Sequence, residues 1–466
     1  MSEMFIRKWS ELSGERFDAE YYKTTNMAIT TYPLKSFVSI RSGKRIPKGE
    51  TYSNTITPYK YLRVEDLDSE SLDIDIDNLK SIDEHIFKLL SRYEIHNDEI
   101  ALSIAGTIGK IFLFKNSTNN QVILTENCVK LQAMNRVLPK FLSIILKTSF
   151  LQNQMKRQYI QTTIPKLAIE RIKELQIPQI PNKQIQQQII DIMDNAYKVK
   201  KDKEQQAQEL LDSIDEYLLG ELGITMPQKA NNTLDSRIFT QKISALSGSR
   251  FDPSYHQKYY QDLEKALQKG KYPLERLKDI TNFIASGATP KSKGEDYEEN
   301  GKYYFLRLVN FTQNLEVDLE NVIFVKEHIY NIDLSRVRVK RGDILFGIAG
   351  SIGKIAQYNY DLPAVINQAI AILRFKKNVF NDFILCILSS NITKNQTSRL
   401  QRPVAQLNIN IQELESLKIP LPPLLIQEQI ADEITHRRDK AKKLQQEAKE
   451  ILESAKKEVE KMILGG

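Results

Sequence analysis

Cysteines, long apolar runs and an apolar leader are scarce or missing in this chain of 466 residues. Cys128 and Cys386 are far apart and neither belongs to a CxxC pair, which argues against a disulfide framework or a zinc site and favours a reducing compartment. No run of 18 apolar residues could span a membrane, and the first residues lack the hydrophobic core of a signal peptide. We therefore expect a cytoplasmic protein without a membrane segment.

The motifs of common nucleotide-binding and hydrolytic enzymes are also missing. No GxxxxGK[ST], GxGxxG, GxSxG or HExxH sequence occurs, and GTIGK and GSIGK have only two residues between their glycines. The chain has no Asn-Pro-Pro-aromatic or Asp-Pro-Pro-aromatic motif, which an amino-methyltransferase would need to grip its target base. The five histidines share no metal-ligand spacing. We therefore expect a chain that binds rather than catalyses, with no metal or cofactor of its own.

Two long amphipathic segments each follow a pair of prolines, IPQIP at residues 177–181 and IPLPP at residues 419–423. Proline prevents an earlier helix start, and apolar residues then recur at steps of three, four and seven, which predicts one long helix in each segment. The apolar seam positions are Ile185, Ile189, Ile192, Ala196, Ala207, Leu211, Ile214 and Leu218 in the first segment, and Ile430, Ile434, Ala441, Leu444, Ala448, Ile451, Ala455 and Met462 in the second. Lys200 and Lys203 weaken the middle of the first seam.

A helix of about 40 residues is roughly 60 Å long and cannot bury such a seam alone. The chain supplies two of them, so we expect an antiparallel two-helix coiled coil that holds two similar domains apart. Two unrelated surface helices on separate cores are the alternative.

The positive charge of the chain lies outside these expected helices. Residues 182–222 carry a net charge of −4 and residues 424–466 a net charge of 0, whereas the remainder carries +11 and the whole chain +7. A polyanion should therefore contact the globular parts. The alternative is that a charge of this size over so many residues is ordinary variation.

The landmarks of the first half return in the second half in the same order, which indicates an internal duplication. The strongest match is ALSIAGTIGKIFLF at 101–114 with LFGIAGSIGKIAQY at 345–358, which predicts a strand, a glycine turn and a strand, with positive φ permitted at Gly106 and Gly350. The other paired landmarks are LSGERFDAEYY (12–22) with LSGSRFDPSYH (246–256), RSGKRIPKGETY (41–52) with ASGATPKSKGEDY (285–297), and YKYLRVEDL (59–67) with YYFLRLVNF (303–311).

Each copy is expected to be a mixed α/β globule followed by one long helix. The expected fold class is therefore α+β, with two similar domains, two long antiparallel helices and pseudo-two-fold symmetry. One short helix is expected after the strands of each copy, at 137–154 and 379–396. The expected boundaries are 1–181 for the first globular domain, 182–223 for the first long helix, 224–423 for the second globular domain and 424–466 for the second long helix.

Basic and amide side chains recur on the turns beside the expected strands. Lys and Arg neutralise phosphates, whereas Arg, Asn and Gln can read base edges. The candidate DNA contacts are Arg41, Lys44, Arg45, Lys48, Arg63, Lys110 and Lys166 in the first copy, and Thr289, Lys291, Lys293, Arg307, Lys354, Asn367, Gln368, Arg399, Arg402, Gln406 and Asn408 in the second. An ordinary solvated surface position remains the alternative for each of them, and we interpret Gly106 and Gly350 as structural.

The tandem layout resembles the specificity subunit of type I restriction-modification systems. The resemblance spans nearly the whole chain and includes the order of the landmarks. The motifs that carry it are SGATPKS (286–292), RGDILFGIAGSIGK (341–354), INQAIA (366–371) and IPLPPLLIQEQIA (419–431). The first copy departs from this pattern, with Thr125-Glu126-Asn127 where the second has Ile366-Asn367-Gln368.

This resemblance implies a DNA-reading scaffold that is not itself an enzyme. Each globule would be a target recognition domain for one half of a split sequence in double-stranded DNA, and the helices would fix the gap between the halves. Two modification subunits, which methylate adenine, and restriction subunits would be the protein partners. S-adenosylmethionine, ATP and magnesium would be bound by those partners only. Because the two copies differ, a bipartite and asymmetric target is expected.

Three other interpretations remain open at this point. The first is a coiled-coil protein-interaction scaffold without direct DNA readout. The second is a module for single-stranded nucleic acid or RNA, for which Tyr303, Tyr304 and Phe305 are a faint sign, although their alternation in a strand favours a core role. The third is an enzyme of unknown type.

Overall fold

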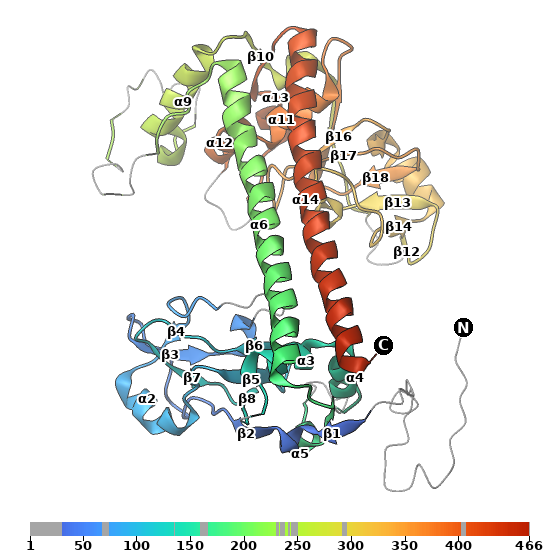
Figure 1. Cartoon of the computed structure of the whole chain (residues 1–466). Coiled ribbons are helices and arrows are strands. Elements are labelled where there is room, and N and C mark those ends of the chain that lie inside the picture. The colour runs from blue at the N-terminus through green and yellow to red at the C-terminus, as the bar shows by residue number, and fades with distance from the viewer. Residues whose placement is uncertain are drawn as a thin grey trace. The chain divides into compact units, whose positions relative to one another are not determined.

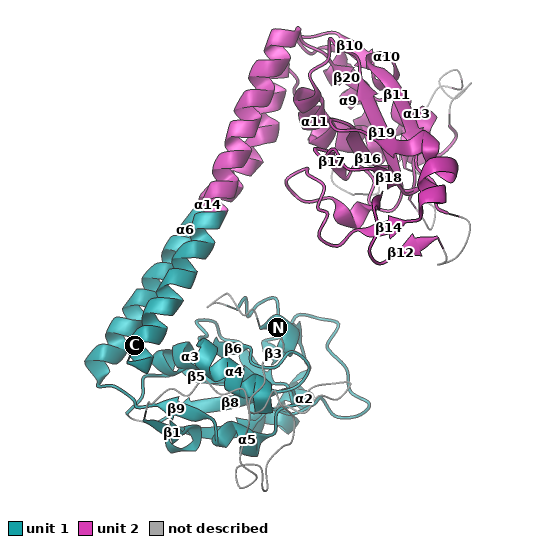
Figure 2. Cartoon of the chain, turned by 90° about the vertical axis from the view of Figure 1, so that its right-hand side faces the viewer, with its two compact units in different colours: residues 1–203, 446–466 teal, residues 204–445 magenta. Residues whose placement is uncertain are grey.

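The chain forms two compact units, which Figure 2 shows in different colours. Unit 1 contains residues 1–203 and 446–466, and unit 2 contains residues 204–445, so each unit takes a part of both long helices. The structure is a computed structural model that describes residues 30–67, 74–134, 136–158, 166–229, 233, 238–240, 243, 250–290, 296–401 and 407–465. The paired landmark at residues 12–22 lies outside the described residues.

The two predicted long helices are present as α6 (Lys183–Leu222) and α14 (Leu424–Leu464), which Figure 1 shows in green and red. In unit 1 the first part of α6 shares a core with the last part of α14, and in unit 2 the last part of α6 shares a core with the first part of α14. The two helices are therefore antiparallel. The buried helix residues of these two cores are Ile189, Ile190, Met193, Ala196, Leu452, Ala455 and Val459 in unit 1, and Leu218, Leu222, Ile430, Ala431 and Ile434 in unit 2.

The last turns of α14 follow the predicted seam only in part, because Ala455 is buried as predicted but the residues around it differ from the prediction. Leu452 and Val459 are buried, whereas the predicted seam residue Met462 is 39% exposed. The end of the helix is oriented by Glu460, whose Oε1 accepts hydrogen bonds from Ser149 Oγ at 2.5 Å and from the N–H of Phe150 at 3.0 Å. Apolar spacing allows either of two neighbouring rows, and the structure buries Leu452 and Val459.

The described residues of unit 1 form two small sheets and a two-stranded ribbon. Its elements are β1 (Thr31–Pro33), β2 (Val38–Ser42), β3 (Tyr59–Leu62), β4 (Lys80–Ser81), α2 (Glu84–Leu90), β5 (Glu99–Ser103), β6 (Ile111–Leu113), β7 (Gln121–Leu124), β8 (Cys128–Ala133), α3 (Pro139–Lys147), α4 (Ser149–Gln158), α5 (Ile169–Lys173) and β9 (Gln176–Pro178). One sheet has the antiparallel order β2-β8-β5-β6, and the other has the order β4-β3-β7 with β3 and β7 parallel. The ribbon pairs β1 with β9.

Unit 2 repeats this arrangement and enlarges the second sheet. Its elements are α9 (Lys258–Gln268), β10 (Leu274–Arg276), α10 (Leu277–Ile280), β11 (Thr281–Ser286), β12 (Tyr297–Glu298), β13 (Tyr303–Leu306), β14 (Ile323–Val325), β15 (Arg338–Val339), β16 (Ile344–Gly347), β17 (Ile355–Gln357), β18 (Ala364–Ile366), β19 (Ile370–Phe375), α11 (Asn381–Ser389), α12 (Asn391–Leu400), α13 (Ile411–Glu415) and β20 (Lys418–Pro420). The sheets have the orders β11-β19-β16-β17 and β12-β14-β13-β18-β15, and the ribbon pairs β10 with β20.

The two units share one topology, which confirms the predicted duplication in the described residues. The order β11-β19-β16-β17 repeats β2-β8-β5-β6, and the parallel pair β13–β18 repeats β3–β7. Gly106 and Gly350 have φ values of 75° and 73°, as the matching glycine turns predict. Neighbouring residues of β5 face two cores, because Ile100 packs among the residues of α3 whereas Ala101 packs among those of β3 and β7. The strand is therefore buried on both faces, which explains its continuous apolar sequence.

The single short helix predicted after the strands is wrong in both copies, because each segment forms two helices. α3 and α4 are separated at Thr148, and α11 and α12 at Ser390. Both break residues have extended backbone angles, and their hydroxyls donate to the carbonyl oxygens of Ile145 and Ile387 at 2.6 Å. A hydroxyl that bonds to a neighbouring carbonyl offers the backbone an alternative to a continuous helix.

A buried glutamine anchors the start of each long helix. Gln186 and Gln427 are 0% and 1% exposed. Nε2 of Gln186 donates to the carbonyl oxygens of Arg136 at 3.0 Å and Pro181 at 2.8 Å, and its Oε1 accepts from the N–H of Leu138 at 2.9 Å. Gln427 makes the corresponding contacts, with the carbonyl of residue 422 at 2.8 Å and the N–H of residue 380 at 2.9 Å. The two copies therefore fix the proline pair, the helix start and the preceding domain in the same way.

Among the residues that the structure describes, no helix is long and apolar enough to cross a membrane. In the same residues, no three His, Cys, Asp or Glu side chains gather as a possible metal site.

Candidate nucleic-acid interface

Four loop segments of unit 1 meet beside the ends of strands and line an open hollow of about 760 Å³. They are the loop after β2, the 3₁₀ turn η3 (Val64–Asp66) after β3, the glycine turn between β5 and β6, and the turn between β7 and β8. The lining residues are Arg45, Ile46, Tyr52, Tyr61, Arg63, Val64, Glu65, Ala105, Gly106, Thr107, Lys110, Thr125, Glu126 and Asn127. The structure thus brings together three predicted DNA contacts, Arg45, Arg63 and Lys110, that are far apart in the sequence.

A glycine in each unit holds two of these loops in contact. Gly43 follows β2, and Gly287 follows β11. A Cβ atom on Gly43 would lie 2.0 Å from the carbonyl oxygen of Thr125, and one on Gly287 would lie 2.2 Å from that of Asn367. Only glycine permits so close an approach of two backbones. The SG pair shared by RSGKR and ASGAT therefore has a packing role. It gives both units the same arrangement of these loops, which we call the loop frame.

Two of the predicted contacts, Lys110 and Lys354, tie the glycine turn to the 3₁₀ turn. Nζ of Lys110 donates to the carbonyl oxygens of Val64 at 3.1 Å and Leu67 at 2.6 Å. Nζ of Lys354 donates to the carbonyl oxygen of Leu308 at 2.8 Å. These side chains hold the loop frame together in both units, and a direct contact with DNA stays a prediction for both.

Carboxylates neutralise the two arginines in the hollow of unit 1. Nε of Arg45 lies 2.6 Å from Oε1 of Glu126. Arg63 forms a bidentate pair with Asp66, with Nε–Oδ2 and Nη2–Oδ1 distances of 3.0 and 2.7 Å, and an ion pair with Glu65. The hydrogen bond with Asp66 is the main reason why the pKa of Arg63 is raised. Burial opposes the charge of Glu126, but hydrogen bonds, chiefly that from Arg45, keep its pKa below the ordinary value.

Neutral residues make the corresponding contacts in unit 2. Oγ1 of Thr289 donates to Oε1 of Gln368, so a neutral pair joins the loop after β11 to the turn between β18 and β19. The backbone N–H of Arg307 donates to Oδ1 of Asn310 at 2.9 Å. Asn367 is half-buried in the same turn as Gln368, and its Oδ1 accepts from a backbone N–H at 3.3 Å. The two loop frames are therefore alike, but their side chains differ in charge.

Five further predicted contacts are exposed and lie near these loops. Arg41, Lys44 and Lys48 come from the end of β2 and the loop after it. Lys166 and Asn408 pair through their backbones with the residue that precedes the first glycine of each glycine turn. None of the five side chains has a hydrogen bond or ion pair with another residue in the described part of the chain. Lys291, Lys293, Arg402 and Gln406, also predicted as contacts, lie outside the described residues.

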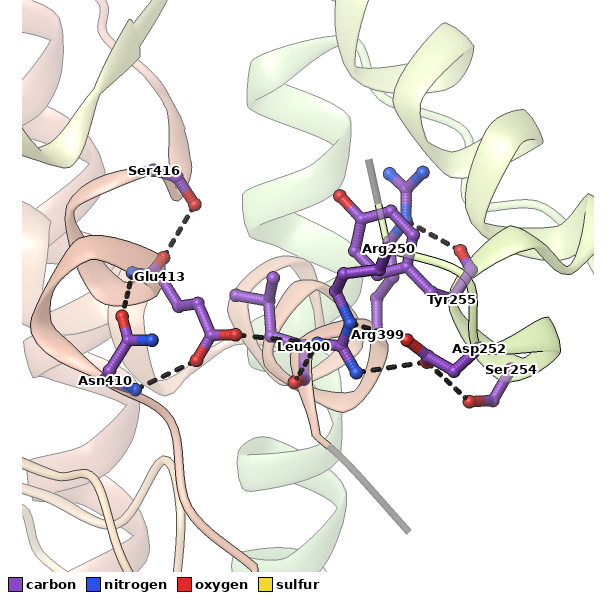
Figure 3. A network of polar contacts seen from close by, with 9 residues as sticks. All are labelled: Arg250, Asp252, Ser254, Tyr255, Arg399, Leu400, Asn410, Glu413 and Ser416. Atoms are coloured by element: carbon purple, nitrogen blue, oxygen red, sulfur yellow. Dashed lines mark hydrogen bonds and ion pairs between the residues drawn. The ribbon is translucent and has the colours of Figure 1, made fainter. Parts of the chain in front are cut away.

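Arg399 belongs to a separate polar network, which Figure 3 shows. Its Nε donates to the carbonyl oxygen of Tyr255 at 3.1 Å, its Cζ lies 4.4 Å from the centroid of that ring, and its Nη1 lies 3.2 Å from Glu264 Oε2. Nη1 of Arg250 lies 3.5 Å from Oε1 of Glu413 in α13 and donates to the carbonyl at the end of α12. The network fastens residues 250–256 to both helices, which gives this copy of the landmark a structural role.

Several residues of the two loop frames were not among the sequence-based candidates. Glu65, Asp66 and Glu126 are absent from that set because it contains only basic, amide and hydroxyl side chains. Tyr61 also lines the hollow, and its Oη donates to the carbonyl oxygen of Lys44 at 2.8 Å. Burial raises the pKa of Tyr61 to about 12, so its hydroxyl stays protonated and acts as a donor at neutral pH. The TEN sequence at 125–127 was the available signal for Glu126, but its predicted correspondence with INQ is wrong by one residue. Thr125 and Asn367 occupy the same position beside Gly43 and Gly287, so Glu126 corresponds to Gln368.

The sequence matches a family model described as the type I restriction modification DNA specificity domain twice, at residues 28–212 and 271–453. The type I restriction enzyme MjaVIII specificity subunit of Methanocaldococcus jannaschii is 26% identical over 382 residues, which cover 79% of this chain and 79% of that protein. The putative type I restriction enzyme MjaX specificity subunit of the same organism is 30% identical over 183 residues, which cover 37% of this chain and 42% of that protein.

A solved structure is also similar in fold. It is described as the structural basis of complex assembly and conformational transition of the type I R-M system. The TM-score is 0.56, and the sequence identity is 16% over 93% of this chain and 97% of that one. At this identity the likeness concerns the fold alone. The two matches to the family model cover well over half of the residues, and each falls on one copy of the duplicated fold. This chain therefore belongs to the type I restriction-modification specificity subunits, and it carries two DNA specificity domains and is not itself an enzyme.

Proposed function

We propose that this specificity subunit reads a bipartite, asymmetric sequence in double-stranded DNA, one half with each domain. The observation that carries the proposal is the repetition of one loop frame with different side chains. The same backbone positions carry an Arg45–Glu126 ion pair in unit 1 and a Thr289–Gln368 hydrogen bond in unit 2. Base pairs differ in the donors and acceptors that they present in the major groove. One frame with two sets of side chains would therefore select two different half-sites.

The two long helices would set the distance between the half-sites. α6 and α14 pack along an apolar seam in both units. A packed helix pair resists compression, because each seam residue fills a space on the partner helix. The number of residues in the helices would therefore fix the number of base pairs between the two recognised sequences.

The proposed partners are double-stranded DNA, two modification subunits that methylate adenine, and restriction subunits. The modification subunits would flip the target adenine out of the duplex. They and the restriction subunits would hold S-adenosylmethionine, ATP and magnesium, while this chain would hold no cofactor. The complex would act in the cytoplasm, where it has access to DNA. These assignments rest on membership of the specificity-subunit family.

The test is to co-express this chain with a modification subunit and to map methylated adenines across the host genome. The expected result is a motif of two unlike half-sites with a constant gap, absent when this chain is left out. A methylation pattern that does not depend on this chain would contradict the proposal and favour a protein-interaction scaffold. Retention of the purified complex on DNA at low salt and its loss at high salt would separate DNA readout from scaffolding in a second way.

A further inference from the structure

The turns after β3 and β13 have the same backbone but different charge. The N–H of Arg63 donates to Asp66 Oδ2 at 2.8 Å, and the N–H of Arg307 donates to Asn310 Oδ1 at 2.9 Å. Each turn is a 3₁₀ helix, η3 in unit 1 and η6 (Leu308–Asn310) in unit 2, and each begins directly after its arginine. Arg307 is therefore the structural equivalent of Arg63, and Asn310 is the equivalent of Asp66.

The guanidinium of Arg63 is paired with carboxylates of the protein itself. Asp66 accepts two hydrogen bonds from it, and Glu65 adds an ion pair. A guanidinium that is paired with two carboxylates has little remaining attraction for an acceptor on DNA. Arg63 would have to give up these contacts before it could bind a base or a phosphate.

Among the described residues, the guanidinium of Arg307 has no carboxylate partner. Its Nε is shielded from solvent and has no hydrogen-bond acceptor among the described residues, and no ion pair joins it to a carboxylate in that part of the chain. The residue at the position of Asp66 is a neutral amide, Asn310, and the residue at the position of Glu65 is Val309, which is 74% exposed. The half-buried Arg307 side chain is therefore not neutralised by a carboxylate among the described residues, and its terminal amino groups can donate to an acceptor on DNA.

The same difference extends to the neighbouring turn. In unit 1 a third carboxylate, Glu126, lies 2.6 Å from Arg45. In unit 2 Gln368 and Thr289 form the corresponding contact without charge. Three carboxylates of the unit 1 frame thus have neutral equivalents in unit 2, while the arginine at the head of the 3₁₀ turn is kept.

We infer that Arg307 reads a base edge in the half-site of the second domain, whereas its equivalent Arg63 is held inside the first domain and makes no base contact. This inference rests on the proposed function. The matching chemistry is the O6 and N7 acceptor pair of guanine in the major groove, to which an arginine can donate two hydrogen bonds. The exposed Val309 lies two residues further on and suits apolar contact with a thymine methyl group next to that guanine.

The experiment uses the full chain assembled with a modification subunit and a library of duplexes with randomised sequence, from which bound DNA is sequenced. Arg307→Ala should keep the motif of one half-site intact and lower the base preference at one position of the other by roughly 10-fold or more. Asn310→Asp is the second variant, because an aspartate there can accept from the same N–H and pair with Arg307, as Asp66 does with Arg63. It should give the same loss while the fold is retained.

The matched control is Arg276→Ala, which removes an exposed arginine of the same unit that pairs with Asp279 at 2.6 Å. It should leave the selected motif unchanged. Arg63→Ala should weaken binding overall, because it leaves Asp66 and Glu65 unpaired beside the DNA, but it should not remove a base preference at any one position. An equal loss of base preference in Arg63→Ala would overturn the inferred difference between the domains. A uniform loss of affinity in Arg307→Ala with an unchanged motif would show that Arg307 does not read a base.

The outcomes separate this inference from the proposed function. If the wild-type complex selects no sequence from the library, the proposed function itself fails. If the wild-type complex selects a bipartite motif and both Arg307→Ala and Asn310→Asp select the same motif with the same preference, only the inference about Arg307 fails.

Discussion

Nζ of Lys203 in α6 lies 2.5 Å from Oε2 of Glu447 in α14, and this ion pair closes the helix pair where the apolar seam of α6 is interrupted. The two side chains are 24% and 35% exposed, so the contact is partly shielded from solvent. An ion pair of this kind contributes about 1 kcal/mol or less to stability. Polar contacts inside a helix pair act mainly on alignment, because a shifted register would leave them unpaired. The polar interruption of the apolar seam can therefore fix the register of α6 against α14.

Lys203→Glu should lower the free energy of unfolding by about 1 kcal/mol, because it puts a second negative charge against Glu447. The double variant Lys203→Glu with Glu447→Lys should recover most of that loss. Thermal unfolding of the four proteins in the double-mutant cycle measures the coupling. Lys201→Glu, at an exposed position of the same helix, is the control and should change little. Equal losses in the single and double variants would contradict a direct interaction.

Gln186→Leu should lower the free energy of unfolding by about 2 kcal/mol or more. Leucine fills a similar volume, but it leaves two carbonyl oxygens and the N–H of Leu138 without their partner in a buried place. Gln187→Leu is the control, because Gln187 is exposed and its amide only bonds to Asp191 one turn later. Urea unfolding compares the two variants. Similar losses for both would mean that the buried amide has no special role.

The free energy of unfolding should fall as the pH rises above about 8.5, the ordinary pKa of a thiol. Burial raises the pKa of Cys128 to about 12 and that of Cys386 to about 11. The unfolded chain therefore loses these protons at lower pH than the folded chain, and each thiol contributes a loss of about 1.4 kcal/mol per pH unit between the two pKa values. Urea unfolding at pH 7 and pH 10 measures the loss. Cys128→Ala should lose less stability over this interval than the wild type, and parallel losses would contradict the assignment.

Lys354→Ala should weaken DNA binding by the assembled complex. The sequence alone predicts a phosphate contact, for which the salt dependence of binding would become flatter. The amine instead donates to the carbonyl oxygen of Leu308, one residue after Arg307, so we expect a loss of affinity with an unchanged salt slope. Titration of a target duplex at several salt concentrations separates the two roles. A slope that falls by about one unit would assign Lys354 to a phosphate.

Insertion of four residues into α6 between Lys198 and Glu204 should change the gap between the half-sites and leave their sequences unchanged. The insertion adds roughly one helical turn, or about 6 Å, to one helix of the pair. Adenine methylation mapping with the variant measures both properties at once. An unchanged gap with altered half-sites would show that the helices do not set the spacing.

The sequence by itself determined the duplication, the two long helices, the glycine turns and the family. These features depend on local properties that repeat along the chain. Apolar spacing produces α6 and α14, and the positive φ of Gly106 and Gly350 favours glycine. The SG pair before Lys44 recurs for a similar reason, because Gly43 touches the backbone of a distant turn.

Only the tertiary structure decided which basic side chains are already paired. Arg45 meets Glu126 across 81 positions of the sequence, and Lys110 reaches a carbonyl 46 positions earlier. Arg63 has a carboxylate three residues later, whereas its equivalent Arg307 has an amide there. The two residues can be compared because their backbone N–H groups make the same hydrogen bond in both turns. A charged side chain pairs with an oppositely charged group that the folded backbone brings within about 4 Å. Which group lies that close depends on the packing of distant segments, and composition and periodicity do not predict that packing.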